Sequence, residues 1–241
     1  MKENYQIKSY GITDTGLKRQ HNEDFILLNK NKNLFILADG LGGHNAGEIA
    51  SSEACMFFNK AFDPGDEQIK NTYNALFKEV NRKIYSLGME NLAYTGMGTT
   101  LICCYIKGGI AHFGHIGDVR GYIFRKGYFI QLTEDQSAVA ELVKKELITE
   151  EEAKNHPLKN IVSQAIGSED SVSPGYVKEA VKKGDIIMLC SDGLWGMLED
   201  SIIRTELQKK APLKKKAENL LKMANEAGGI DNISHILVQI T

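Results

Sequence analysis

Short apolar segments, most of them bounded by Gly, Asn or Asp, recur along the chain and predict β-strands. They span residues 5–12, 24–28, 33–38, 99–106, 110–116, 121–125, 128–132, 185–190 and 232–240. Two pairs of neighbouring segments are separated only by Lys107-Gly108-Gly109 and by Lys126-Gly127, which is the spacing of a hairpin turn. We therefore expect neighbouring strands to pair antiparallel.

Apolar residues recur at helical spacing in three longer blocks, which are residues 48–62, 66–87 and 213–224. The last block is followed by Gly228-Gly229, a helix stop signal. Two shorter helices are predicted at 137–146 and 149–156, and Thr149 with Glu152 forms a capping box at the start of the second. This order of strands and helices predicts an α+β fold in which helices cover antiparallel sheets, rather than a repeat of βαβ units.

Composition narrows the class of protein. The chain has 241 residues, of which 42% are hydrophobic and 25% charged, as in an ordinary globular protein and unlike a disordered one. With 29 Lys and Arg against 31 Asp and Glu, the net charge of -2 gives no attraction for nucleic acid or an anionic membrane. No linker, repeat, signal peptide or apolar run of about 18 residues is present. We expect a single domain over residues 1–241 in a soluble, cytoplasmic protein.

The placement of the acids is more informative than their number. Two predicted strands each end in the same tripeptide, Asp39-Gly40-Leu41 and Asp192-Gly193-Leu194. Asp118 follows another strand, Asp231 precedes the last one, and Asn22-Glu23-Asp24 opens an early one. Carboxylates that converge from several strand ends repel one another unless protons or a cation lie between them. Oxygen ligands without clustered His or Cys favour Mg²⁺ or Mn²⁺ over Zn²⁺.

Each of these sequence features, taken alone, also has a simpler structural interpretation. A single Asp-Gly after a strand is most often a turn, and only the repetition of the pattern favours a metal site. The glycines from Gly40 to Gly43 do not fit the G-x-G-x-x-G pattern of a dinucleotide fold. His112 and His115 would point to opposite faces of a strand, so we expect both to be structural. The four cysteines lie in apolar stretches and are expected to be buried thiols: Cys55, Cys103, Cys104 and Cys190.

Seven ordered motifs give the chain a family resemblance from about Tyr10 to its C-terminus. They lie at residues 16–24, 38–48, 96–100, 117–122, 132–137, 191–194 and 229–234, and they include Asn-Glu-Asp, Asp-Gly-Leu-Gly-Gly-His, Ser-Asp-Gly-Leu and Asp-Asn-Ile-Ser. In this order they resemble the metal-dependent PPM, or protein phosphatase 2C, family, and most of all its compact bacterial members that act on Ser/Thr phosphoproteins. The resemblance implies a four-layer α-β-β-α sandwich with a two-metal centre at one end.

The resemblance also assigns metal ligands. It implies that Asp39 bridges two Mn²⁺ or Mg²⁺ ions, that the carbonyl of Gly40 binds one of them, and that Asp192 and Asp231 bind the other. Asp24 and Glu23 would hold metal-bound waters, and Asp118 would support a third, weaker ion.

Two further residues match family positions near the substrate. Arg19 would grip the substrate phosphate, a task for which a planar guanidinium is suited. His44 would either donate a proton or organise waters and the loop, and the residues leave both roles open. The polar segment 137–168 matches a mobile flap, which would select substrates. At Val119, Gln136 and Ser234 the chain departs from the common family residues Ser, His and Thr, none of which is an expected metal ligand.

The expected activity is hydrolysis of phosphoserine and phosphothreonine in proteins by a metal-bridging hydroxide, without a phosphoenzyme. Phosphoproteins, including a cognate Ser/Thr kinase and its substrates, would be the partners of a monomeric enzyme. Two alternatives are a catalytically silent relative, which should have lost one of Asp39, Asp192 or Asp231, and an enzyme of a stress or sporulation switch, which usually carries extra sensor segments.

Overall fold

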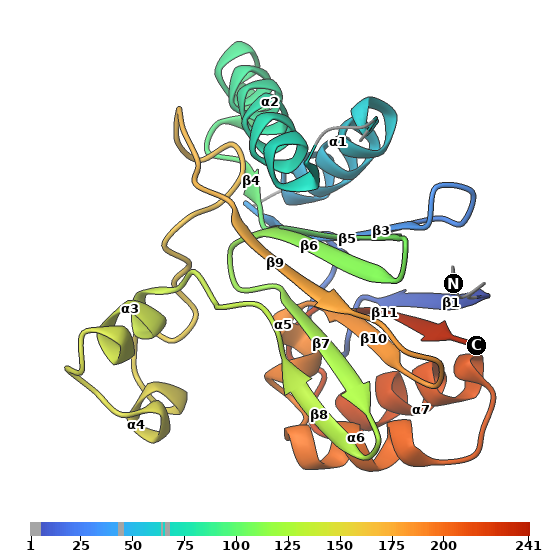
Figure 1. The fold of residues 1–241 in the computed structure, drawn as a ribbon. Helices are drawn as coiled ribbons and strands as arrows, with labels where there is room; N and C mark the ends of the chain where they lie inside the picture. The colour runs from blue at the N-terminus through green and yellow to red at the C-terminus, as the bar shows by residue number, and fades with distance from the viewer. Residues whose placement is uncertain (1–5, 43–45, 64, 66–67) are drawn as a thin grey trace.

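Two β-sheets lie face to face, and helices cover their outer faces (Figure 1). The computed structural model describes residues 6–42, 46–63, 65 and 68–241. In the first sheet the strands lie in the order β1-β11-β10-β7-β8, and every pair is antiparallel. These strands are β1 (Ile7–Asp14), β7 (Arg120–Arg125), β8 (Tyr128–Gln131), β10 (Ile186–Cys190) and β11 (Ile233–Ile240).

The second sheet has the order β2-β3-β5-β6-β9, with β4 paired to β3, and it too is antiparallel throughout. Its strands are β2 (Asp24–Asn29), β3 (Leu34–Leu41), β4 (Gly98–Thr99), β5 (Leu101–Lys107), β6 (Ile110–Ile116) and β9 (Gly175–Ala180). The predicted hairpins β5–β6 and β7–β8 are both present.

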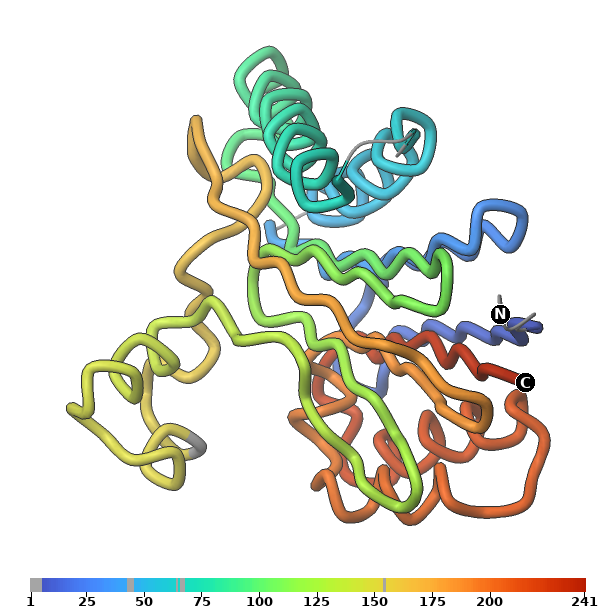
Figure 2. The backbone as a smooth tube through the Cα atoms, in the orientation of Figure 1, coloured from blue at the N-terminus to red at the C-terminus, as the bar shows by residue number. Residues whose placement is uncertain are grey.

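The helices divide between the two outer faces and a projecting lobe. The second sheet is covered by α1 (Ala46–Ala61) and α2 (Ile69–Glu90), which is followed by the short 3₁₀ helix η1 (Leu92–Tyr94). The first sheet is covered by α5 (Asp192–Trp195), α6 (Asp200–Gln208) and α7 (Leu213–Glu226). The lobe carries α3 (Ala138–Lys144) and α4 (Glu150–Lys154), and it stands away from the sandwich in the trace of the backbone (Figure 2).

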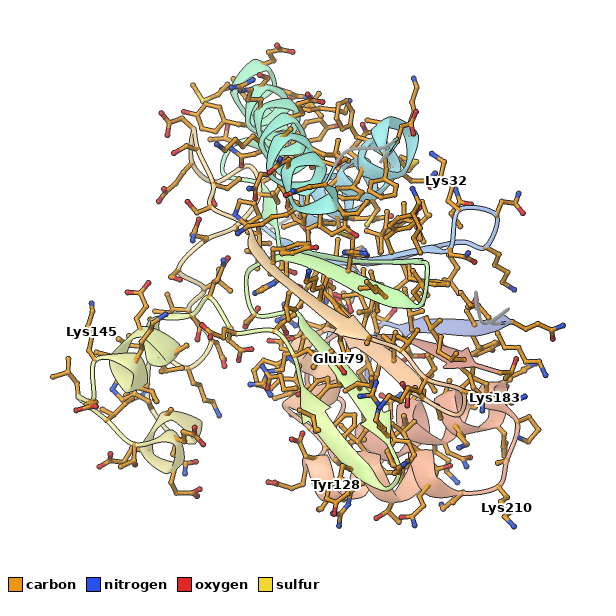
Figure 3. All side chains as sticks on the ribbon, in the orientation of Figure 1. Lys32, Tyr128, Lys145, Glu179, Lys183 and Lys210 are labelled. Carbon is orange, nitrogen blue, oxygen red and sulfur yellow. The ribbon has the colours of Figure 1, made fainter. Side chains whose placement is uncertain are left out.

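Strand alternation builds the layers. Along β3, Leu34 and Ile36 pack against α1 and α2, while Phe35 and Leu37 face the other sheet and meet Ile187 and its neighbours. Side chains fill the space between the sheets (Figure 3). Because successive residues of a strand point to opposite faces, one apolar segment serves two cores. The predicted four-layer α-β-β-α arrangement is confirmed.

Most of the predicted elements are confirmed, including the capping box of Thr149 and Glu152, but several are corrected. The sequence pattern does not predict β9, because the charged residues Lys178 and Glu179 interrupt its apolar residues, as befits a strand at the edge of a sheet. The helices α5 and α6 and the short η1 are not predicted either, and the predicted strand 99–106 is divided between β4 and β5. No helix in the described part of the chain is long and apolar enough to cross a membrane.

Candidate metal centre

Two of the predicted acids face each other across the β2–β3 pair. The register places Asp24, at the start of β2, opposite Asp39, near the end of β3. Directly opposite residues in an antiparallel pair have Cβ atoms about 5 Å apart. The backbone of Asp39 is also fixed, because its carbonyl accepts hydrogen bonds from the Thr99 hydroxyl and the Thr100 N–H, both at 2.8 Å. Strand pairing therefore brings these two carboxylates together.

The first sheet delivers its acids to the same place. β10 pairs with β7 so that Cys190 lies opposite Arg120. Asp192, two residues after Cys190, and Asp118, two residues before Arg120, therefore leave this strand pair at the same end. Asp231 precedes β11, which is the other neighbour of β10. The charges of Asp24, Asp192, Asp118 and Asp231 all act on Asp39, so the two sheets bring their acids to one cluster.

Burial and mutual repulsion make these carboxylates hard to ionise. Burial raises the pKa of Asp24 and that of Asp118 to about 7, and the pKa of Asp192 to about 6, from an ordinary value of 3.8. The pKa of Asp39 is raised well above its ordinary value, first by burial and then by the charges of Asp24 and Asp192. A positive charge placed among these carboxylates would favour their ionised form at neutral pH.

The donor set fits a hard divalent cation. The buried atoms Asp24 Oδ1 and Asp192 Oδ1 have no hydrogen-bond partner, while Asp24 Oδ2 accepts a hydrogen bond from the Ser191 hydroxyl at 2.8 Å. An unpartnered buried carboxylate oxygen is costly. Mg²⁺ and Mn²⁺ prefer such oxygen ligands, whereas Zn²⁺ prefers His and Cys. The residues present therefore suit the ions that the sequence predicts.

Asp231 is turned toward Arg19. Its Oδ2 accepts a hydrogen bond of 2.8 Å from the Arg19 guanidinium, and its Oδ1 accepts one of 2.8 Å from the N–H of Asn232. Partial burial would lower the pKa of Arg19, but Asp231 outweighs this effect and the pKa is raised. Within the described part of the chain, no three or more His, Cys, Asp or Glu side chains are close enough together to form a group that could hold a metal ion. The acids converge without forming a closed cage.

Gly40 and Glu23 also lie in this region. A Cβ on Gly40 would collide with the Gly47 carbonyl and lie 2.6 Å from the Glu23 carbonyl, so only glycine fits there. A Cβ on Gly47, in the first turn of α1, would lie 2.7 Å from Glu23 Oε2. The pKa of Glu23 is raised by burial, against the charge of Arg19. The predicted site residue His44 lies outside the described residues.

Sequence reasoning missed several residues that support the acids. Ser191 bonds to Asp24, and its Oγ also accepts a hydrogen bond of 3.0 Å from the N–H of Ser234. The Arg120 guanidinium makes hydrogen bonds of 2.7–3.1 Å to the carboxylate of Asp135, and it stacks on the Trp195 ring at 3.5 Å. Arg120 therefore links the approach to segment 137–168 with α5, which begins at Asp192. The sequence offers one sign of their importance, which is that Ser191, Arg120 and Asp135 all lie within the family motifs.

The three departures from the family pattern are all accommodated. Val119 packs in the apolar core between the sheets. The Gln136 side chain accepts a hydrogen bond from the Gly117 N–H at 3.0 Å and donates one to the Ser173 carbonyl at 3.1 Å. The Ser234 hydroxyl donates to Thr13 Oγ1 at 2.7 Å. Val119 is thus accommodated by apolar packing, and Gln136 and Ser234 by hydrogen bonds.

A family model described as protein phosphatase 2C matches residues 16–238. The chain belongs to this family. It is a protein phosphatase by that membership, as the resemblance implied. Among its relatives is the protein phosphatase PhpP of Streptococcus pneumoniae, which is 42% identical over 239 residues that cover 95% of this chain and 96% of PhpP.

Solved structures of other phosphatases have the same fold. The serine/threonine phosphatase of S. agalactiae is 40% identical and superposes with a TM-score of 0.93, covering 98% of this phosphatase and all of that chain (100%). The catalytic domain of the serine/threonine protein phosphatase PstP, solved in complex with two manganese ions, is 31% identical with a TM-score of 0.88, and the match covers 99% of this chain and 100% of that one. The fold that positions the acids is thus the fold of the family.

Proposed function

We propose that this phosphatase hydrolyses phosphoserine and phosphothreonine in proteins at the carboxylate cluster, with the help of two Mn²⁺ or Mg²⁺ ions. The observation that carries the proposal is the convergence of four acids with raised pKa values beside the guanidinium of Arg19: Asp24 and Asp118, which are buried, and Asp39 and Asp192, which are half-buried. Relatives named as serine/threonine phosphatases, and a similar catalytic domain that binds two manganese ions, support the same activity. When bound, such ions polarise a phosphate ester and make an attacking water nucleophilic at neutral pH.

Each acid has a proposed part in holding the ions. Asp39 would contact both, the carbonyl of Gly40 would contact one, and Asp192 with Asp231 would contact the other. Asp24 and Glu23 would act through waters, and Asp118 would support a third ion that binds more weakly.

Arg19 would bind the substrate phosphate. Its guanidinium lies within 2.8 Å of Asp231, so a phosphate that enters the site meets a positive charge already aimed at the cluster. The planar guanidinium can bind two phosphate oxygens at once. Asp231 is then free to contact an ion. For His44 we retain the two roles that the sequence leaves open, donation of a proton to the leaving oxygen or ordering of waters.

A covalent phosphoenzyme on cysteine is disfavoured. Cys55, Cys103, Cys104 and Cys190 are all fully buried free thiols. Burial raises the pKa of each of them, that of Cys103 to about 12. A thiol is nucleophilic as the thiolate, which these surroundings disfavour. Hydrolysis by direct attack of water, the mechanism that the family resemblance implies, needs no such nucleophile.

The wider setting is also a proposal. We infer a single cytoplasmic domain over residues 1–241 that acts as a monomer, with segment 137–168 as a flap that contacts the phosphoprotein. A cognate Ser/Thr kinase and its substrates would supply the phosphate esters. The near balance of charge gives no footprint for nucleic acid or membrane.

The experiment is phosphate release from a phosphothreonine peptide in the presence of Mn²⁺. Wild type should release phosphate from this peptide and from a second peptide that carries phosphoserine in place of phosphothreonine. Arg19→Ala should raise KM about thirtyfold, because a hydrogen bond to a charged group contributes roughly 2 kcal/mol. Arg82→Ala, an exposed arginine on α2, is the matched control and should behave as wild type. No release by wild type from either peptide would refute the proposed function.

A further inference from the structure

Asn232 makes an unusual set of contacts with the segment that carries Arg19. It lies between Asp231 and β11 and is buried, with 5% of its surface exposed. Its Oδ1 accepts a hydrogen bond from the Glu23 N–H at 2.8 Å, and its Nδ2 donates to the carbonyls of Thr15 and His21, both at 2.9 Å. All three bonds therefore end on the backbone of residues 15–23, which we name the Arg19 loop.

The Arg19 loop has little apolar packing of its own. Residues 17–21 are exposed, and Leu17 retains 64% of its surface. Its other anchors are also hydrogen bonds. The N–H groups of Leu17 and Lys18 donate to the Gly229 carbonyl at 2.7 and 3.2 Å, and further bonds join the loop to Asp14, Thr13 and Gly40. Such a loop is held in place by polar contacts rather than by burial of apolar surface. Its conformation should therefore be sensitive to loss of individual hydrogen bonds.

Asn232 holds both ends of the loop at once. Thr15 lies before Arg19 in the chain, while His21 and Glu23 lie after it. The asparagine amide has the donors and the acceptor that these three backbone groups need. An aspartate at this position would keep an acceptor for the Glu23 N–H but would place an oxygen against the two carbonyls. The side chain that closes the loop also lies next to Asp231, the partner of Arg19.

We infer that Asn232 is a positioning residue for phosphate binding: it fixes the Arg19 loop so that the guanidinium of Arg19 is held at the carboxylate cluster. Asn232 itself touches neither the phosphate nor the reacting atoms. It acts through Arg19, by reducing the number of conformations from which the guanidinium must be recruited. This inference rests on the phosphate-binding role proposed for Arg19.

The test is a double-mutant cycle on the full chain with Mn²⁺ and p-nitrophenyl phosphate. Asn232→Ala should raise KM, and the inhibition constant of inorganic phosphate, about tenfold, with kcat changed by no more than about threefold. In the Arg19→Ala background the same substitution should change KM by less than about twofold, because the group it positions is gone. Asn219→Ala is the control and should match wild type, because it removes a hydrogen bond between α7 and Glu206 of α6 that does not involve the Arg19 loop.

Two outcomes would overturn the inference. One is a KM effect of Asn232→Ala that is as large without Arg19 as with it; the other is a loss of kcat with KM unchanged. Asn232→Asp, which preserves the size of the side chain, serves in the same cycle if the alanine variant does not fold. Wild type that releases no p-nitrophenol would instead refute the proposed function.

Hydrogen exchange provides a readout that does not depend on activity. In Asn232→Ala the amide of Glu23 and peptides that cover residues 15–23 should exchange about tenfold faster, with β3 and β10 unchanged. Unchanged exchange in residues 15–23 would show that the loop holds its shape without Asn232, and would also overturn the inference.

Discussion

Asp39→Asn should lower kcat/KM by at least about a thousandfold and at the same time stabilise the metal-free protein. The loss of activity follows because Asp39 lies at the centre of the cluster and would contact both ions, and removal of a single transition-state contact already costs a factor of about 10²–10³. The gain in stability follows because desolvation, and then the charges of Asp24 and Asp192, raise the pKa of this half-buried carboxyl group and disfavour its ionised form. The neutral amide removes that repulsion.

Urea unfolding in the presence of a chelator measures the stability effect. Near pH 8 we expect the free energy of unfolding to rise by about 1–2 kcal/mol, the amount associated with relief of one unfavourable buried charge interaction. With Mn²⁺ present the order should reverse, because the variant binds the ions less well. Asp170→Asn, at an exposed position, should leave activity and stability as they are. A destabilised, fully active Asp39→Asn protein would contradict the assignment.

The metal-free protein should lose stability as the pH rises from about 4 to about 8. Asp24, Asp118 and Asp192 have folded-state pKa values of about 7, 7 and 6, above the ordinary 3.8. In this range the folded state binds more protons than the unfolded state, so the free energy of unfolding falls with rising pH. The stability that these protons provide is complete below about pH 4 and is lost as the pH passes 6 to 7. The total effect is on the order of several kcal/mol.

Mn²⁺ should reverse this trend. Because carboxylates must be ionised to bind a metal, the stabilisation by Mn²⁺ should be small near pH 5 and large near pH 8. Thermal unfolding at both pH values, with chelator and with Mn²⁺, measures it. Equal stabilisation at the two pH values, or a metal-free protein that gains stability between pH 5 and pH 8, would contradict the picture of a repelling carboxylate cluster.

How far the sequence predicts this site depends on the kind of information that each residue carries. Asp39 and Asp192 were identifiable because an apolar run followed by Asp-Gly-Leu occurs twice, and the run fixes a strand end. Their convergence could not be derived from spacing, because it depends on register: Asp24 lies opposite Asp39 only because β2 pairs with β3 residue for residue. The family resemblance supplied what the pattern alone could not.

Other features left no pattern to find. β9 is an edge strand with polar residues such as Lys178, so its alternation is weak. Asn232 and Ser191 act through hydrogen bonds to groups that are distant in the chain. Asn232 bonds to Glu23, 209 residues away, and Ser191 bonds to Asp24, 167 residues away. In the sequence, a polar residue next to a motif acid looks the same whether its side chain is merely adjacent to the acid or holds a distant segment in place by hydrogen bonds. Only the fold distinguishes the two.

Anomalous diffraction from crystals grown with Mn²⁺ tests the central claim most directly, because it locates the ions independently of activity. We expect manganese peaks in contact with the Asp39 carboxylate, one of them also in contact with Asp192, and Arg19 within reach of the same space. An active protein whose manganese lies away from Asp39, or whose cluster binds none, would contradict the account.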